Sequence, residues 1–212
     1  MIVAIDGPAG AGKSTVARKL AERLGFRYLD TGAMYRALTW LALREGLPLG
    51  DPEPLGSLAR RNPVTFDEVG RVFIAGTDVT SAIRQARIDQ IVPVVARHAP
   101  VREVMRERQR DLARHGNVVI EGRDIGTVVA PGAEVKVYLQ ADQEIRARRR
   151  QRERPDIGPD ALATDLRARD KSDRERMQPA EDAILIDTTE LQVDDVVGRI
   201  ETLIRERSLI AP

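Results

Sequence analysis

A glycine-rich stretch close to the start of the chain constrains the fold more than any other feature. It reads Gly7, Pro8, Ala9, Gly10, Ala11, Gly12, Lys13, Ser14 and fits the pattern G-x-x-x-x-G-K-[ST]. The apolar, β-branched run at residues 1–5 predicts a strand before it, and residues 13–24 repeat apolar side chains at helical spacing after it. A strand, a glycine loop and a helix in this order indicate a phosphate-binding P-loop.

The residue types of this loop fit phosphate chemistry. Glycines let the backbone turn N–H groups towards phosphate oxygens, at a helix N-terminus whose dipole favours negative charge. We expect Lys13 to place its charge at the β- and γ-phosphates of ATP, and the Ser14 hydroxyl to ligate Mg²⁺. The predicted ATP-binding residues are Gly7, Pro8, Ala9, Gly10, Ala11, Gly12, Lys13, Ser14 and Thr15. The alternative is a turn that only connects a strand to a helix, and the complete pattern in its expected context argues against it.

Composition limits the other possibilities. The 212 residues predict a single domain, and a formal net charge of +1 provides no global field that would recruit nucleic acid or a membrane. We expect a cytoplasmic monomer without an export signal or a membrane span. The chain contains no cysteine, which excludes thiolate zinc sites, and its two histidines, His98 and His115, are expected at the surface.

The order of apolar runs predicts an α/β fold with a central, mostly parallel five-stranded sheet flanked by helices. After the first strand, we expect strands at residues 26–29, 118–120, 135–139 and 184–186. Residues 64–79 predict a small antiparallel meander within an insertion of roughly residues 62–82. Pro93 should break or kink the helix predicted at residues 83–97. Residues 142–176 predict two basic helices joined by a proline and glycine turn. We interpret them as a mobile helical lid, although a solvated helical hairpin is the alternative.

Several polar residues follow the predicted strands, where ligands bind in open parallel sheets: Asp30, Thr31, Glu121, Arg123 and Asp124. Transfer of a phosphoryl group to a second phosphate brings two anions together, and this requires cations around both. Arginines suited to that task are Arg36, Arg123, Arg169, Arg174 and Arg176. Because a phosphate acceptor is already ionised near neutral pH, the reaction needs no general base.

These residues carry a family resemblance over the whole chain. The chain resembles the bacterial cytidylate kinases, within the group of P-loop nucleoside-monophosphate kinases. The matching motifs are residues 5–15, residues 29–36, Val101-Arg102, the stretch Gly122-Arg123-Asp124-Ile125-Gly126-Thr127-Val128-Val129, and residues 169–176. The Gly-Arg-Asp stretch and the β insertion are more specific than the P-loop.

The resemblance implies a role for each site residue. The residues implied in catalysis are Lys13, Arg123, Arg176 and Arg149. Binding of the acceptor CMP is implied for Asp30, Thr31, Arg36, Arg102, Arg123, Asp124, Arg169, Asp173 and Arg176. Among these, Arg36, Arg123 and Arg176 would hold the phosphate, Arg169 and Asp173 the ribose, and Asp124 and Arg102 the cytosine. Pro93 departs from the family pattern, since we expect a serine that helps to bind the base at this position.

The resemblance also implies a division of one kinase domain. The core would comprise residues 1–35, 101–145 and 177–212, and the acceptor-binding region residues 36–100. A lid would cover residues 146–165, followed by an acceptor-contacting helix at 160–176. The implied activity is ATP- and Mg²⁺-dependent phosphorylation of CMP or dCMP. The alternatives are a UMP/CMP kinase, another small-molecule P-loop kinase, and a nucleotide-binding regulator or nucleic-acid ATPase.

Overall fold

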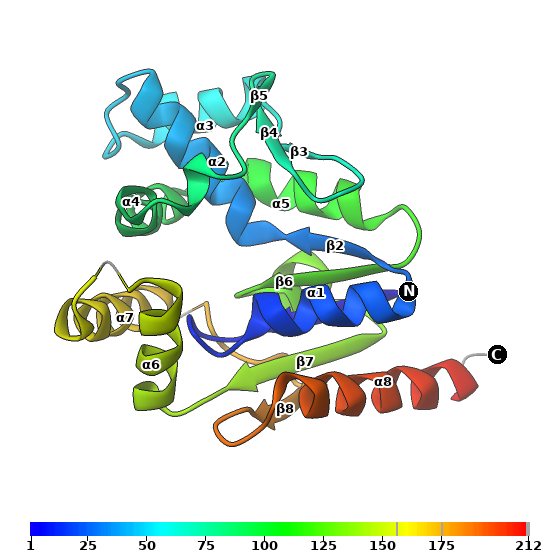
Figure 1. The fold of residues 1–212 in the computed structure, drawn as a ribbon. Coiled ribbons are helices and arrows are strands. Elements are labelled where there is room, and N and C mark those ends of the chain that lie inside the picture. The colour runs from blue at the N-terminus through cyan, green and yellow to red at the C-terminus, as the bar shows by residue number, and fades with distance from the viewer. Residues whose placement is uncertain (156, 175, 211–212) are drawn as a thin grey trace. The chain divides into compact units, whose positions relative to one another are not determined.

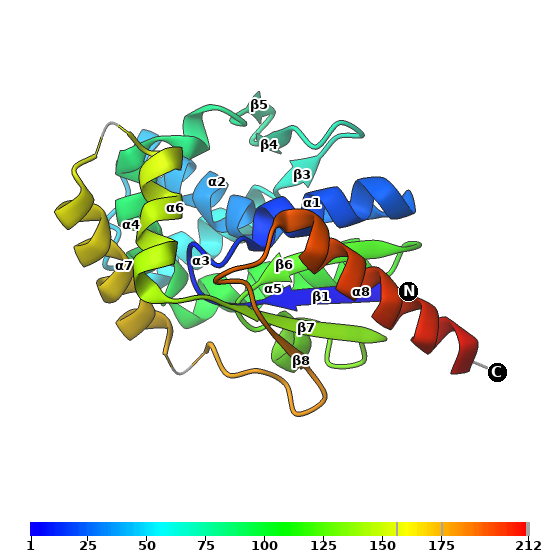
Figure 2. The same ribbon diagram turned by 60° about the horizontal axis from the view of Figure 1, so that its bottom comes forward.

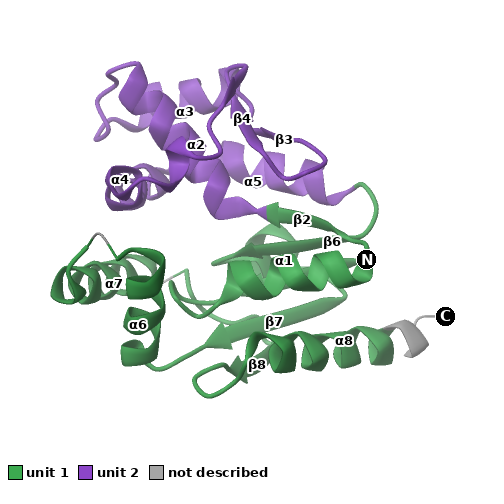
Figure 3. Cartoon of the chain, in the orientation of Figure 1, with its two compact units in different colours: residues 1–29, 115–212 green, residues 30–114 purple. Residues whose placement is uncertain are grey.

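The computed structural model describes residues 1–155, 157–174 and 176–210, with side chains up to residue 207. Asp156, in the predicted turn between the two basic helices, and Glu175, in the motif at residues 169–176, lie outside this part of the chain. The chain divides into two compact units, Met1–Leu29 with His115–Pro212, and Asp30–Arg114 (Figure 3). Each unit has its own core, and each is described by itself.

The first unit is built on a parallel sheet. Among the described residues the sheet has five strands in the order β2-β6-β1-β7-β8 (Figures 1 and 2). These strands are β1 (Ile2–Asp6), β2 (Arg27–Asp30), β6 (Val118–Gly122), β7 (Val135–Gln140) and β8 (Ile184–Asp187). The other elements are α1 (Lys13–Leu24), the short π-helical turn η2 (Ile125–Val129), α6 (Gln143–Glu153), α7 (Pro159–Asp173) and α8 (Val193–Ile210). The predicted fold class, a P-loop kinase fold with a five-stranded central sheet, is confirmed.

The core of this unit explains the apolar runs of the sequence. Strand β1 lies at the centre of the sheet and pairs in parallel with both β6 and β7. Its residues Val3, Ala4 and Ile5 are fully buried, because a central parallel strand is covered on both faces. Helices α1 and α8 contact each other and pack their apolar faces into one core with the strands. The loop of residues 7–12 that follows β1 places the start of α1 beyond the carboxyl end of this strand.

The second unit combines helices with a small antiparallel sheet. The sheet has the order β3-β4-β5, with β3 (Thr65–Phe66), β4 (Val72–Ile74) and β5 (Thr77–Asp78), and confirms the predicted β insertion. Helices α2 (Thr31–Arg44) and α4 (Ala86–Ala96) contact each other, and so do α3 (Pro52–Arg61) and α5 (Ala99–Ala113). A 3₁₀ turn, η1 (Ala82–Arg84), precedes α4.

Two predictions within this unit are wrong. Pro93 does not break the helix, because α4 continues through it, and the chain instead leaves helical geometry at Gln85, whose backbone is extended. Proline removes one helical N–H donor. The packing of buried Ile88 and Val95 on either side outweighs this loss. His98 is buried rather than exposed, since its Nε2–H donates to the carbonyl of Leu49 at 2.8 Å.

Among the described residues, no helix is both long enough and apolar enough to cross a bilayer.

Candidate active site

The glycine loop lies between β1 and α1, as the sequence predicts. Gly7 has a φ of 144°, and a Cβ atom there would lie 2.1 Å from the carbonyl oxygen of Leu139 in β7. A Cβ atom on Gly10 would lie 2.9 Å from Cβ of Arg146. The loop is therefore pressed against its neighbours so closely that side chains at these two positions have no space.

Lys13 begins α1 at the centre of a buried cluster of charges. Its ammonium group donates to the carbonyl of Pro8 at 2.7 Å, and only 7% of the residue is exposed. Burial, followed by the charge of Arg123, lowers the pKa of Lys13 to about 7, and the carboxylates of Glu121, Asp6 and Asp173 oppose this shift. An anion at the loop would compensate the buried charge of the lysine.

Ser14 is hydrogen-bonded to a buried carboxylate. Its hydroxyl donates to Oε2 of Glu121 at 2.9 Å, and the phenol of Tyr28 donates to Oε1 of the same side chain. Glu121 is 4% exposed and is the last residue but one of β6, the strand next to β1. A hydroxyl beside a carboxylate is an oxygen donor set of the kind that Mg²⁺ accepts, so these residues fit the predicted metal. The sequence marked Glu121 by its place after a strand but gave it no role.

The turn after β6 brings together several residues predicted to bind the acceptor. Arg123 donates through Nη1 to the carbonyl of Gly7 at 3.1 Å and through Nε to Asp173 at 3.2 Å. Asp173 also accepts from Nη2 of Arg176 at 2.7 Å. Asp124 follows Arg123 directly and precedes η2. In this unit, therefore, the P-loop backbone contacts an arginine of the predicted acceptor set, and this arginine contacts the end of α7.

Arg169 lies one helical turn before Asp173 on α7. Its Nε is 3.1 Å from a carboxylate oxygen of Asp165, and its side chain is largely buried. The predicted ribose pair, Arg169 and Asp173, therefore stands on one helix at a spacing of four residues, which places both on the same face.

A second arginine cluster lies in the other unit, around Asp30. The buried Asp30 carboxylate caps α2 by accepting from the backbone N–H of Ala33 at 2.8 Å. It also accepts from Nη2 of Arg36 and from Nη2 of Arg84, each at 2.9 Å. Burial opposes ionisation of this carboxyl. The charges of Arg36 and Arg84 outweigh burial and hold the pKa of Asp30 below its usual value. Nothing in the sequence marked Arg84 as a partner of Arg36.

Thr31 and Arg102 lie on helices of the same unit. Thr31 is buried in the first turn of α2. Arg102 lines a hollow of about 410 Å³ along α5, together with Ala99, Glu103, Arg106, Glu107 and Arg110.

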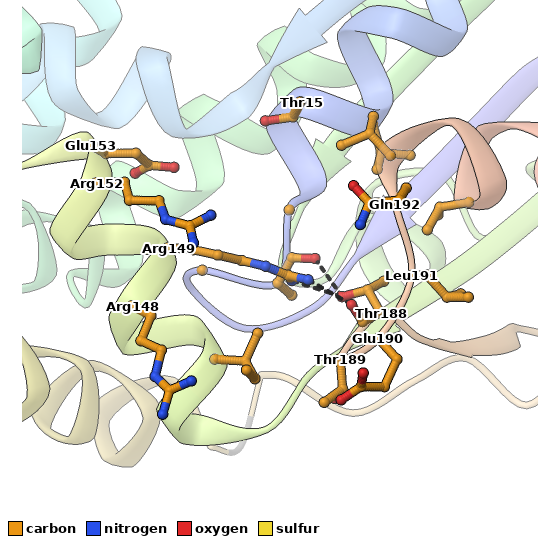
Figure 4. A pocket seen from close by; sticks show the side chains of 17 residues that line it. Thr15, Arg148, Arg149, Arg152, Glu153, Thr188, Thr189, Glu190, Leu191 and Gln192 are labelled. Carbon is orange, nitrogen blue, oxygen red and sulfur yellow. Dashed lines mark hydrogen bonds between the residues drawn. The ribbon is translucent and has the colours of Figure 1, made fainter.

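A larger cavity of about 490 Å³ opens beside the P-loop in the first unit (Figure 4). Its walls are Gly10, Ala11, Gly12 and Thr15 of the loop and α1, the α6 residues Ile145, Arg148, Arg149, Arg152 and Glu153, and residues 188–193 after β8. Figure 4 shows Arg149 extending towards Thr188, where its Nη1 donates to Oγ1 at 2.9 Å. The Thr188 hydroxyl in turn donates to the carbonyl of Ala11 at 3.1 Å. Sequence reasoning missed residues 188–193, although they follow a parallel strand as Arg123 does.

Arg146, at the start of the predicted lid, is built into the fold. The residue is 7% exposed, and its Nη1 donates to the carbonyl of Ala9 at 3.1 Å. Both of its terminal nitrogens also contact the carboxylate of Asp170 in α7, at 3.1 and 2.7 Å. Arg146 therefore links α6 and α7 to the P-loop, whereas Arg149, one turn later, lines the cavity.

Comparison with protein families decides between the kinases that share this fold. A sequence model of one family, described as "Cytidylate kinase", matches residues 3–206. The chain belongs to the cytidylate kinase family. The resemblance of its motifs to bacterial cytidylate kinases is thereby confirmed.

Curated members of the family align with almost the whole chain. A cytidylate kinase of Geobacillus sp. (strain WCH70) is 49% identical over 216 residues, which cover 97% of this chain and 96% of the relative. A cytidylate kinase of Bacillus subtilis (strain 168) is 46% identical, covering 97% of each chain. A crystal structure of shikimate kinase from Bacteroides thetaiotaomicron superposes with a TM-score of 0.54 at 16% identity, covering 97% of this chain and 98% of that one. This last similarity concerns the fold alone.

Proposed function

We propose that this member of the cytidylate kinase family transfers the γ-phosphoryl group of ATP to CMP or dCMP, giving CDP or dCDP and ADP. The observation that carries the proposal is the hydrogen bond from Arg123 to the carbonyl of Gly7. It holds a guanidinium of the family's Gly-Arg-Asp motif against the loop that binds donor phosphates. A cation at this position can face both the transferring phosphoryl group and the phosphate that accepts it.

The donor half of the reaction is assigned to the P-loop and the cavity beside it. The loop N–H groups and Lys13 hold the β- and γ-phosphates. Burial disfavours the protonated form of Lys13, and the negative charge of bound ATP favours it again. Ser14 and Glu121 hold Mg²⁺, which neutralises charge on the donor phosphates when bound. Arg149 supplies a further cation from α6, where it lies 4.0 Å from the position that a Cβ atom on Gly12 would take. The nucleoside of ATP occupies the 490 Å³ cavity.

The acceptor phosphate is assigned to Arg36, Arg123 and Arg176. Guanidinium groups suit this role because they bind phosphate with two parallel hydrogen bonds. Asp30 and Thr31 belong to the same assignment, and the Asp30 carboxylate orients Arg36. The acceptor is the nucleophile through an ionised phosphate oxygen, so the chain has to position and neutralise rather than remove a proton.

The nucleoside of the acceptor is assigned to the remaining residues. Arg169 and Asp173 bind the ribose hydroxyls. Asp124 accepts from the exocyclic amine of cytosine, and Arg102 donates to the ring acceptors. Uracil has a carbonyl where cytosine has its amine, so UMP would place an acceptor against the carboxylate of Asp124. Since Pro93 has no hydroxyl, base selection in this chain depends on Asp124 and Arg102.

The chain is proposed to act as one kinase domain with a core, an acceptor-binding region at 36–100, a lid at about 146–165 and an acceptor-contacting helix at 160–176. We further propose that it is a cytoplasmic monomer whose partners are its nucleotides alone, without nucleic acid or membrane.

A coupled assay of ADP formation tests the proposal, with CMP, dCMP, UMP, AMP and GMP as acceptors at one ATP and Mg²⁺ concentration. We expect the highest kcat/KM with CMP or dCMP. Faster turnover of UMP would support the wider UMP/CMP kinase, and faster turnover of AMP or GMP would contradict the assignment. Salt-dependent RNA binding without phosphorylation of any acceptor would instead indicate a nucleic-acid ATPase.

A further inference from the structure

Asp6, the last residue of β1, has a buried carboxylate that none of the assignments above uses. Only 6% of the residue is exposed. Its Oδ1 accepts from the backbone N–H of Ile125 at 2.9 Å, and its Oδ2 accepts from the N–H of Gly126 at 2.8 Å. Both amides follow Asp124 directly in the chain. The side chain at the end of β1, the strand that leads into the P-loop, therefore holds the turn that carries Asp124, the residue proposed to recognise the base.

The turn is attached to β1 and to the first residue of the P-loop on both sides of Asp124. Asp6 pairs with Gly122 in the register of β1 and β6, and Arg123 donates to the carbonyl of Gly7. The amides of Ile125 and Gly126 complete the connection on the far side. The backbone of Asp124 lies outside regular helical and strand geometry, with φ −135° and ψ 32°. The hydrogen bonds from Arg123 to Gly7 and from the two amides to Asp6 therefore fix the turn on both sides of Asp124.

The charges that act on Asp6 agree with its position between Lys13 of the P-loop and Asp124 of the turn after β6. Burial raises the pKa of Asp6, while the N–H groups of Gly126 and Ile125 lower it. The charge of Asp124 raises this pKa further, and the charge of Lys13 lowers it. Asp6 is thus close enough to the P-loop lysine and to the base-reading carboxylate to interact with both, although it stands one residue before the glycine pattern.

We propose that Asp6 is a positioning residue for base selection, which orients Asp124 and Arg123 relative to the P-loop. The inference rests on the proposed function, because base selection presupposes a cytidine nucleotide as acceptor. Asp6 does not touch the substrate. It acts through its hydrogen bonds from the two amides of the turn. Its loss should therefore disturb the orientation of Asp124 more than it weakens the binding of ATP.

The test uses the ratio of kcat/KM for CMP to kcat/KM for UMP in the full-length chain. Any change in folded fraction, in ATP binding or in Lys13 affects both acceptors equally and cancels in this ratio. Asp6→Asn keeps the size of the side chain but presents an amide N–H to one of the two donors. We expect it to lower the CMP to UMP ratio about tenfold. Asp194→Asn is the control, since the exposed carboxylate of Asp194 on α8 accepts from Nζ of Lys19 at 2.9 Å, away from the residues assigned to the site, and should leave the ratio unchanged.

A double variant separates positioning from an independent effect. If Asp6 acts through Asp124, then Asp6→Asn should change the ratio little in a chain that already carries Asp124→Asn. Additive effects, or an unchanged ratio in Asp6→Asn alone, would overturn the proposal. Asp6→Ser provides a second variant should the asparagine form not fold. If neither variant folds, Asp6 serves the fold itself and the proposal is likewise overturned.

The wild-type chain distinguishes this outcome from failure of the proposed function. A wild type that does not prefer CMP contradicts the proposed function. A wild type that prefers CMP, with variants that keep the same preference, contradicts only the role of Asp6.

Discussion

The two loops that follow the neighbouring strands β1 and β6 present different groups to the ligands: backbone groups after β1 and side chains after β6. The loop after β1 presents backbone groups, and its constraint is space, as the close approach of Gly7 to Leu139 illustrates. The turn after β6 presents the side chains of Arg123 and Asp124, and its constraint is orientation. Backbone N–H groups recognise any phosphate, whereas side chains aimed by hydrogen bonds can distinguish one base from another. Generic binding and specificity therefore reside in adjacent loops and should respond differently to substitution.

The largest expected effect concerns Arg123. Arg123→Ala should lower kcat/KM for CMP by about 10³-fold, because it removes a cation from the charge that develops during transfer. Binding of ATP should weaken far less, since the loop amides and Lys13 remain. Steady-state kinetics with CMP, combined with calorimetry of ATP binding, would measure both. An equal loss in kcat/KM for CMP and in the affinity for ATP would contradict the assignment of Arg123 to the acceptor.

A smaller effect, on stability, is expected for the glycine loop. Gly7→Ala should lower the free energy of unfolding by about 3 kcal/mol, because the new Cβ atom overlaps a backbone carbonyl and the φ of 144° disfavours a side chain. Gly132→Ala is the matched control, since a Cβ atom there meets no atom within 4 Å. Urea denaturation would measure both variants. Similar stabilities would show that the loop can shift away from β7.

Base selection should change without a change in stability at Asp124. Asp124→Asn should lower the CMP to UMP ratio of kcat/KM by about tenfold or more, since an amide can donate to uracil as well as accept from cytosine. Thermal unfolding should be nearly unchanged. An unaltered ratio would place base reading elsewhere, with Arg102 as the remaining candidate.

The smallest expected effect is the uptake of a proton by Lys13 when ATP binds. The pKa of Lys13 in the folded chain is about 7, well below that of an unfolded lysine. Between these two values the folded chain binds fewer protons than the unfolded one, so Lys13 contributes stability that rises with pH above 7 and is lost as pH falls through 7. Donor phosphates should raise this pKa.

ATP binding at pH 8 should therefore take up at most about one proton. Calorimetry in two buffers of different ionisation enthalpy measures this uptake. Lys13→Arg keeps its charge throughout this range and should abolish it, and equal uptake in Lys13→Arg would assign the proton to another group.

Local patterns in the chain predicted the elements well. The run at residues 13–24 is helix α1, and the strands of the central sheet lie within two residues of their predicted positions. For α1 and for the inner strands β1, β6 and β7 this agreement follows from burial, because an inner parallel strand is apolar nearly throughout and a covering helix is apolar on one face. Helix α4 is the exception, since its packing outweighs the effect of Pro93 in a way that local pattern cannot reveal.

The partners of the site residues could not be predicted in this way. Glu121 beside Ser14, Thr188 beside Arg149 and Arg84 beside Asp30 are separated in sequence by 107, 39 and 54 residues. Arg146 and Arg149 look equivalent in a basic run, yet the first is buried against Asp170 and the second lines the cavity.

By itself, the sequence determined that this chain has a P-loop, a parallel α/β sheet and the motifs of a cytidylate kinase, because spacing and residue type are local properties. Only the tertiary structure decided which charge meets which. Asp6 stands directly before the glycine loop, but its carboxylate bonds to amides 119 and 120 residues away. That pairing depends on the parallel register of β1 and β6, which no local pattern encodes.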